Sequence, residues 1–295
     1  MSRSLPLQQA PGTPQHSAPR GAPAVRRPQP WLWFAAPGLA LFAAFWLLPM
    51  LRLFSVGASG PDGVAAYFAV LTNHRYFISL LSTLTLSAVV TLATLLIASL
   101  VGLFLQRNRF PGQQLLMAML TFPLAFPGVV VGFMVIMLAG RQGLIGSISH
   151  ALFGDAWVFA YSLSGLFLGY LYFSIPRVIL TVVAAAEKLD PALEEAARSL
   201  GASPLRVLTD IVMPALLPAL ISSGAICFAT SVGAFGTAFT LATRIDVLPM
   251  TIYNEFTGYA NFAMAAALSI VLGVITWLVL ALARSLTGNG VAAAA

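Results

Sequence analysis

Few side chains in this 295-residue chain are suited to acid–base, metal or redox chemistry, and they are scattered. The nine acidic residues lie outside the six long charge-free stretches of the sequence, as do the histidines His16, His74 and His150. The single cysteine, Cys227, can form neither an internal disulfide nor a cysteine metal site. The single lysine, Lys188, belongs to no G-x-x-x-x-G-K-[ST] loop, which is the usual ATPase signature. The sequence therefore predicts a protein without catalytic chemistry of its own.

One polar segment, 187–214, has the residue order of two capped helices. Asp190 is suited to cap a helix whose first residue is Pro191, because proline lacks the N–H that the first turn leaves unpaired. Gly201 suits the left-handed residue that ends a helix. Ser203-Pro204 repeats the cap and the start for a second short helix. We expect a helix–turn–helix that is either a solvated connector or a docking surface for a partner protein.

Composition places these elements in a membrane. Hydrophobic residues make up 59% of the chain and charged residues only 8%, whereas about a quarter of a soluble domain is charged. Too little charge remains to cover a water-soluble monomer of this size. The net charge of +6 comes from 15 basic residues that are spread along the chain. Because a nucleic-acid surface needs clustered basic residues, we expect no nucleic-acid partner.

The charge-free stretches predict an all-α integral membrane protein with six transmembrane helices. About 20 apolar residues span a bilayer, and backbone groups in lipid must pair within a helix. We expect the spans near 31–51, 80–104, 115–138, 158–184, 215–237 and 262–284. Residues 1–30 hold seven of the 19 prolines and are predicted to be a disordered cytoplasmic tail. The membrane domain then covers 31–290, and 291–295 form a C-terminal tail.

Basic residues predict the orientation of the spans. With the N-terminus inside, ten basic residues fall in cytoplasmic segments and four in outer loops. Because lysine and arginine are enriched on the cytoplasmic side, both termini are predicted to be cytoplasmic. The 187–214 segment then becomes a cytoplasmic loop.

The sequence also bears on the source of energy for transport. A carrier driven by protons or sodium generally places carboxylates or histidines within its spans, and none lies there. An ion-coupled secondary transporter nevertheless stays as the alternative.

Arg177 is the one charge inside a predicted span. It is expected either to reach toward the membrane surface or to line a path for an anionic solute. A G-x-S-G match at 57–60 would suit an intramembrane protease, but no span offers a histidine base.

The loop resembles the EAA signature of binding-protein-dependent ABC importer permeases. That pattern is EAA, three residues, G, nine residues, then I-x-L-P. It matches here at Glu195-Ala196-Ala197, Gly201, Ile211 and Pro214, with Met213 in place of the leucine. The resemblance extends over about 80–295. It implies a type I ABC importer permease fold, with the 187–214 loop contacting a cytoplasmic ATPase.

The resemblance also implies the partners. Two permease subunits, the same chain twice or two homologous chains, would pair with two copies of an ABC ATPase. A periplasmic or lipid-anchored solute-binding protein would deliver the solute, and lipid would surround the spans. ATP and Mg would be used by the ATPase, and this chain would bind no cofactor or metal. The location implied is a bacterial inner membrane, and the solute a polyamine, ferric iron or a phosphonate such as 2-aminoethylphosphonate.

Several polar side chains are candidates for the solute path. The predicted fifth span carries the hydroxyls of Ser222, Ser223, Thr230, Ser231 and Thr237. They are expected either to form internal hydrogen bonds or, with Arg177, to line the path. Pro123 and Pro127 are expected to kink the third span.

Overall fold

The computed structural model describes residues 31–241 and 245–287, and every regular element within these ranges is helical. The predicted tails, 1–30 and 291–295, lie outside the described residues. The chain divides into two compact units, Met1–Pro49 and Met50–Ala295. The described part of the first unit comprises α1 (Trp31–Phe42), the π-helix η1 (Ala43–Leu47) and the start of α2 (Leu48–Gly57).

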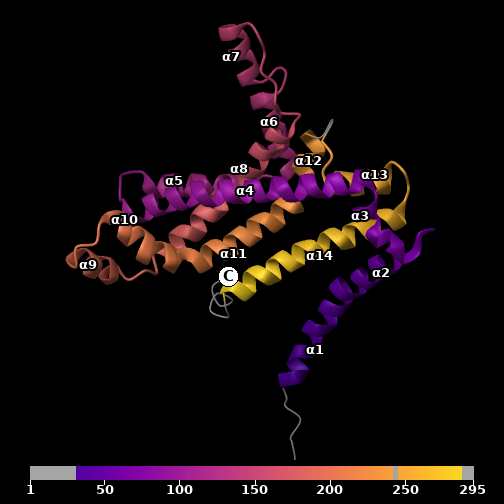
Figure 1. The fold of residues 1–295 in the computed structure, drawn as a ribbon, viewed down its shortest axis with the longest axis horizontal. Coiled ribbons are helices and arrows are strands. Elements are labelled where there is room, and N and C mark those ends of the chain that lie inside the picture. Colours follow the sequence, from indigo (N-terminus) through magenta and orange to yellow (C-terminus); the bar gives the residue numbers. More distant parts are fainter. Residues whose placement is uncertain (1–30, 242–244, 288–295) are drawn as a thin grey trace, which may run out of the picture. The chain divides into compact units, whose positions relative to one another are not determined.

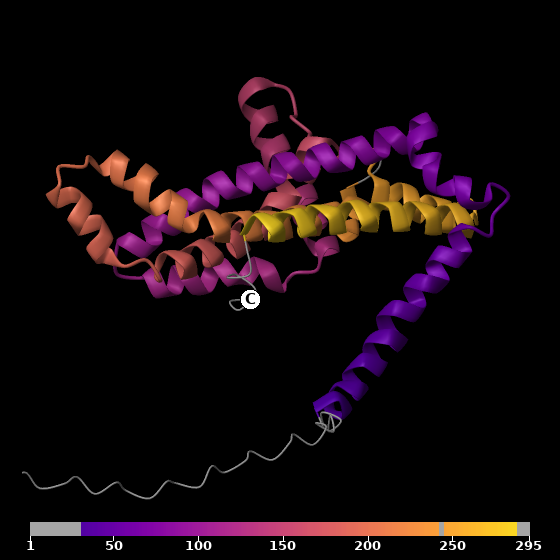
Figure 2. The same cartoon turned by 60° about the horizontal axis from the view of Figure 1, so that its bottom comes forward.

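The second unit contains the remaining helices, drawn in Figures 1 and 2. In chain order they are η2 (Gly63–Phe68), α3 (Ala69–Thr72), α4 (His74–Arg107), α5 (Gln113–Thr121), η3 (Phe122–Ala125), α6 (Gly128–Ala139), α7 (Leu144–Phe153), α8 (Leu163–Ala186), α9 (Pro191–Ser199), α10 (Pro204–Val207), η4 (Leu208–Val212), α11 (Met213–Val232), α12 (Phe235–Leu241), α13 (Leu248–Thr257) and α14 (Phe262–Thr287).

Six helical stretches are long and apolar enough to cross a membrane, the number predicted from the sequence. They are Ala35–Gly57, His74–Arg107, Gly128–Phe153, Leu163–Ala186, Pro204–Val232 and Phe262–Thr287. The second, fourth and sixth contain most or all of the predicted spans. The first, third and fifth differ from their predicted bounds.

The second unit is built around α4, which packs along α8. The α4 face that is buried carries small residues three or four positions apart: Ser79, Thr83, Ser87, Thr91, Thr94, Ala98 and Gly102. Small side chains let helix backbones approach closely in a membrane. At Gly102, an added Cβ would lie 2.8 Å from Val182 Cγ1 of α8. The Thr83 and Thr91 hydroxyls each donate to a carbonyl four residues earlier, at 2.7 Å, so these buried groups are paired within the helix.

Two apolar cores lie along this bundle. The larger joins α4, α8 and α11 through side chains such as Val90, Ile179 and Leu216. The smaller joins α3, α13 and α14 to the beginning of α4, with Val70 and Leu268 at its centre. Figures 1 and 2 both place the loop that carries α9 and α10 at the opposite end of the unit from α13. The bundle therefore presents two distinct ends.

The predicted third span, 115–138, is not one helix. It is divided into α5, η3 and α6 by an extended backbone at Phe126 (ψ 131°) and Pro127 (ψ 148°). Proline disfavours helical geometry at the residue before it and lacks the N–H that a continuing helix requires. The prolines therefore break the span where a kink was expected. The apolar stretch continues past residue 138: α6 ends at Ala139, and α7 follows a turn at 140–143 and ends at Phe153.

The predicted fifth span, 215–237, also has different ends. Helix α11 is preceded without interruption by α10 and the π-helix η4, so the helical stretch begins at Pro204. It ends at Val232, before Gly233, and a separate helix α12 follows. The second helix of the 187–214 loop is thus the start of the fifth span rather than a separate short helix. Thr237, expected on the fifth span, lies on α12 instead.

Candidate functional site in the 187–214 loop

Local hydrogen bonds fix the first helix of the loop as the sequence predicts. The Asp190 carboxylate accepts from the Ala192 N–H at 2.9 Å, and Pro191 is the first residue of α9. Gly201 ends the helix with φ +83°, a left-handed conformation that glycine adopts without steric cost. Its N–H donates to the Arg198 carbonyl at 2.9 Å. The start and the end of α9 are therefore determined by adjacent residues.

The second helix is capped in the same way and is joined directly to α11. The Ser203 hydroxyl accepts from the Arg206 N–H at 3.3 Å, and Pro204 is the first residue of α10. Val207 is buried and Ile211 packs against the larger core. Pro214 is the second residue of α11 and directly follows the π-helix η4 within the continuous helix from Pro204. A displacement of this part of the loop would therefore act directly on α11.

One side of α9 is exposed although it carries apolar residues. Glu195, Ala196 and Leu200 are exposed, whereas Ala197 packs toward the core. The Leu200 side chain has a relative exposure of 89%, and Leu205 on α10 has 70%. Leu200 lies on the polar loop, and Leu205 lies in the first turn of the helix that leads into α11, next to Arg206. Exposed apolar groups rimmed by polar residues typically mark a surface for a protein partner.

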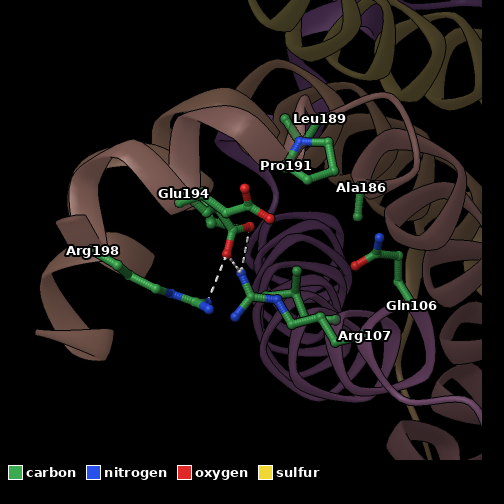
Figure 3. A pocket seen from close by; sticks show the side chains of 10 residues that line it. Gln106, Arg107, Ala186, Leu189, Pro191, Glu194 and Arg198 are labelled. Atoms are coloured by element: carbon green, nitrogen blue, oxygen red, sulfur yellow. Dashed lines mark hydrogen bonds and ion pairs between the residues drawn. The ribbon is translucent and has the colours of Figure 1, made fainter.

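Glu194 connects α9 to the end of α4. Its carboxylate accepts from Arg107 Nη2 at 2.8 and 3.0 Å, and from Arg198 Nη2 at 3.3 Å. Figure 3 shows the guanidinium groups of Arg107 and Arg198 both directed toward the Glu194 carboxylate. The pair borders a cavity of about 350 Å³ between α4, α8 and α9. Because Arg107 is partly exposed, the ion pair contributes about 1 kcal/mol or less to stability. Its geometry still ties α9 to α4.

Glu195 is among the site residues predicted from the sequence, whereas Glu194 and Arg107 are not. The two residues are 87 positions apart, and each is one of several charged residues near a loop. Nothing in the spacing of the sequence marks them as a pair. Of the other predicted loop residues, Ala197, Gly201 and Ile211 line one pocket. Glu195 and Ala196 are exposed on α9, and Pro214 lies in the first turn of α11.

The predicted solute-path hydroxyls do not form one cluster. Ser223 donates to the Leu220 carbonyl at 3.3 Å, and Thr230 donates to two carbonyls of its own helix at 2.9 Å. Ser231 is buried with no hydrogen-bond partner among the described residues. Ser222 is half-buried on α11.

Arg177 and Thr237, by contrast, line the same cavity of about 380 Å³, which Ser222, Ser223, Thr230 and Ser231 do not border. The Thr237 hydroxyl donates to the Gly128 carbonyl at 2.9 Å. These two residues therefore border one cavity from α8 and α12, whereas the α11 hydroxyls are distributed along one helix.

Comparison with protein families gives one match that covers most of the chain. Residues 95–289 match the family described as "Binding-protein-dependent transport system inner membrane component". The matched range contains α8, the 187–214 loop and α11. It begins within α4 and ends beyond α14.

Individual relatives cover most of the chain. A Salmonella typhi protein, named as the 2-aminoethylphosphonate transport system permease protein PhnU, is 31% identical over 269 residues, which are 88% of this chain and 93% of that protein. The molybdenum transport system permease protein ModB of Escherichia coli K12 is 34% identical over 217 residues, 71% of this chain and 93% of ModB.

Solved structures resemble the fold. A chain of the bacterial alginate ABC transporter, crystallised with an alginate-bound periplasmic protein, superimposes with a TM-score of 0.76 at 20% identity and covers 88% of this chain and 96% of that chain. A chain of the inward-facing MetNI methionine ABC transporter superimposes with a TM-score of 0.57 at 17% identity, covering 73% and 96%. At these identities the resemblance establishes the fold alone.

Proposed function

Since the chain belongs to the family of binding-protein-dependent transport system inner membrane components, we propose that its 187–214 loop couples it to a separate ATPase. The chain is the multi-pass permease subunit of an ATP-driven ABC importer in a bacterial inner membrane. It is a transporter component, and ATPase activity lies in separate subunits. Each chain would form half of the solute path.

The observation that carries the coupling proposal is the exposed face of α9. Leu200 is 89% exposed at the tip of a helix whose two ends are fixed by Asp190 and Gly201. A rigid helix with an apolar tip suits insertion into a groove of a partner protein. Closure of the ATPases on ATP would draw the loops of two permeases together. The displacement would reach α4 through Glu194–Arg107 and α11 through the continuous helix from Pro204.

The proposed assembly has two ATPase copies, two permease subunits and one solute-binding protein. The second permease is this chain or a homologue, and the binding protein is periplasmic or lipid-anchored. Lipid surrounds the spans. ATP and Mg act in the ATPase, and this chain holds no cofactor or metal. Both termini and the 187–214 loop face the cytoplasm, as the distribution of basic residues favours.

For the solute we propose a phosphonate such as 2-aminoethylphosphonate. The PhnU relative, which aligns over 269 residues, supports this choice over ferric iron or a polyamine. The charge of the spans supports it too. Among the spans predicted from the sequence, Arg177 is the one charged residue that lies away from a span end, and it would repel a polyamine and attract a phosphonate oxyanion. The α11 hydroxyls, Ser222, Ser223, Thr230 and Ser231, together with Thr237 stay as proposed path residues.

Reconstitution tests the proposal. Proteoliposomes that hold this chain and its ATPase, with the binding protein outside and ATP inside, should accumulate 2-aminoethylphosphonate. Vesicles with this chain alone should not. Accumulation by the lone chain under an ion gradient would establish the ion-coupled alternative. Leu200→Glu should abolish ATPase co-purification, because it places a charge at the apolar tip, whereas Leu200→Met should retain it. Equal co-purification of the two variants would contradict docking through α9.

A further inference from the structure

A cavity of about 380 Å³ lies where two membrane helices are broken. One wall is the break between η3 and α6, and the other is the break between α11 and α12. Two α8 side chains, Phe173 and Arg177, complete the lining. Its remaining residues are Pro123, Leu124, Phe126, Gly128, Gly233, Ala234, Phe235, Gly236 and Thr237. A volume of this order accommodates a small solute.

Hydrogen bonds between distant segments hold the two breaks in place. The Tyr170 hydroxyl of α8 donates to the Ala234 carbonyl at 2.8 Å. The Thr237 hydroxyl donates to the Gly128 carbonyl at 2.9 Å, joining the two breaks to each other. A Cβ at Gly236 would lie only 3.0 Å from the Val129 nitrogen, so the backbones themselves are in contact. The cavity is therefore bounded by a fixed framework.

Arg177 is the one charged residue among those that line this cavity. Within residues 31–241 and 245–287, the ion pairs join Arg107, Arg198 and Arg206 to carboxylates, and Arg177 belongs to none of them. No residue that lines the cavity is acidic. Arg177 is nine residues from the end of α8 at Ala186, about 14 Å along the helix. An unpaired charge at that depth is costly, and such residues typically mark a path for substrates or ions.

We propose that Arg177 and this cavity form a transit site for a small oxyanion, such as the phosphonate group of the solute. A guanidinium binds two oxygens of a phosphonate in parallel, and the geometry selects oxyanions over neutral solutes. Phe126, Phe173 and Phe235 give the cavity apolar walls. Exclusion of water between such walls strengthens the attraction between the charges. The inference rests on the proposed function, since it assigns a place in this chain to the proposed solute.

Two pairs of variants test the charge of the cavity. Each is measured in proteoliposomes with the ATPase and the binding protein. Arg177→Gln should lower 2-aminoethylphosphonate uptake at least tenfold. Arg284→Gln, which removes an exposed arginine from the end of α14, should leave uptake unchanged. Leu124→Glu places a carboxylate on the cavity wall and should lower uptake at least tenfold below Leu124→Gln, which differs only in charge. Co-purification with the ATPase checks the folding of each variant.

The ligand of Arg177 could instead be the phosphate of a lipid headgroup, and a binding measurement distinguishes the two sources. The permease–ATPase complex in a maltoside detergent, which carries no phosphate, should bind 2-aminoethylphosphonate saturably by calorimetry without the binding protein. Binding should be lost in Leu124→Glu and in Arg177→Gln. If neither the wild-type complex nor the variants bind 2-aminoethylphosphonate saturably, Arg177 is assigned to a lipid phosphate and the proposal is overturned.

The outcomes separate this site from the function on which it rests. Wild-type vesicles that take up no phosphonate would overturn the proposed solute and the site with it. Wild-type uptake that Arg177→Gln leaves unchanged would overturn the site alone. If Arg177→Gln fails to assemble, the comparison of Leu124→Glu with Leu124→Gln decides, and equal uptake by these two variants would refute the site.

Discussion

Substitution of Gly201 by alanine should weaken coupling to the ATPase without disturbing the membrane bundle. Gly201 has φ +83°, and a Cβ added there would meet no atom within 4 Å. The cost is therefore confined to the backbone, and the left-handed conformation costs an alanine about 1–2 kcal/mol. Because the tip of the loop is exposed, the free permease can relax into another conformation. Docking would then have to restore the strained one.

The strain converts into a loss of affinity. An energy of about 1–2 kcal/mol corresponds to a factor of about 5–30 in an equilibrium constant. We expect Gly201→Ala to raise the dissociation constant between the permease and its ATPase by up to that factor, measured by titration in nanodiscs. ATP-driven uptake at limiting ATPase concentration should fall in parallel. Gly201→Asn should restore much of the affinity, since asparagine tolerates the left-handed region.

Gly154 provides the matched control. It also has φ +83° with no atom within 4 Å of an added Cβ, but it ends α7 rather than α9. Gly154→Ala thus introduces the same backbone strain away from the proposed docking loop, and ATPase affinity should stay at the wild-type value. Equal affinities for Gly201→Ala and wild type would refute the reasoning. An equal loss in both alanine variants would show a general effect of strain and would refute it as well.

Three further results are expected. A double-mutant cycle of Glu194→Gln with Arg107→Gln on thermal unfolding should show a favourable coupling of about 0.2–1 kcal/mol. Strictly additive effects would show that the ion pair does not connect α9 to α4. Impermeant maleimides should label cysteines introduced at Asn108 and Leu200 only in inside-out vesicles, and labelling of right-side-out vesicles at either position would contradict cytoplasmic loops. Tyr170→Phe leaves the Ala234 carbonyl without its 2.8 Å partner. The variant should be less stable by about 1 kcal/mol and should unfold at a lower temperature. An unchanged unfolding temperature would contradict this expectation.

The parts of the fold that local chemistry determines were predictable. The ends of α9 follow from the Asp190 side chain, the Pro191 ring and the conformational freedom of Gly201, each of which acts on backbone within a few residues. The number of spans follows from apolar runs, because backbone groups in lipid pair only within a helix. The break in the third span was predicted only as a kink. The sequence gives the positions of the prolines, but the low helix propensity of proline does not distinguish a bent helix from one that is fully interrupted.

The class of protein, the number of spans and the capping residues of the 187–214 loop could therefore be predicted from the sequence. The contacts between distant side chains depended on the tertiary structure. The contact of Glu194 with Arg107 joins positions 87 apart, and the cavity around Arg177 is assembled from α8 and two helix breaks more than 100 residues apart. Such pairings depend on how helices pack, which is the sum of many weak contacts along α4, α8, α11 and α12. The spacing of residues within one segment therefore does not predict which helices pack together.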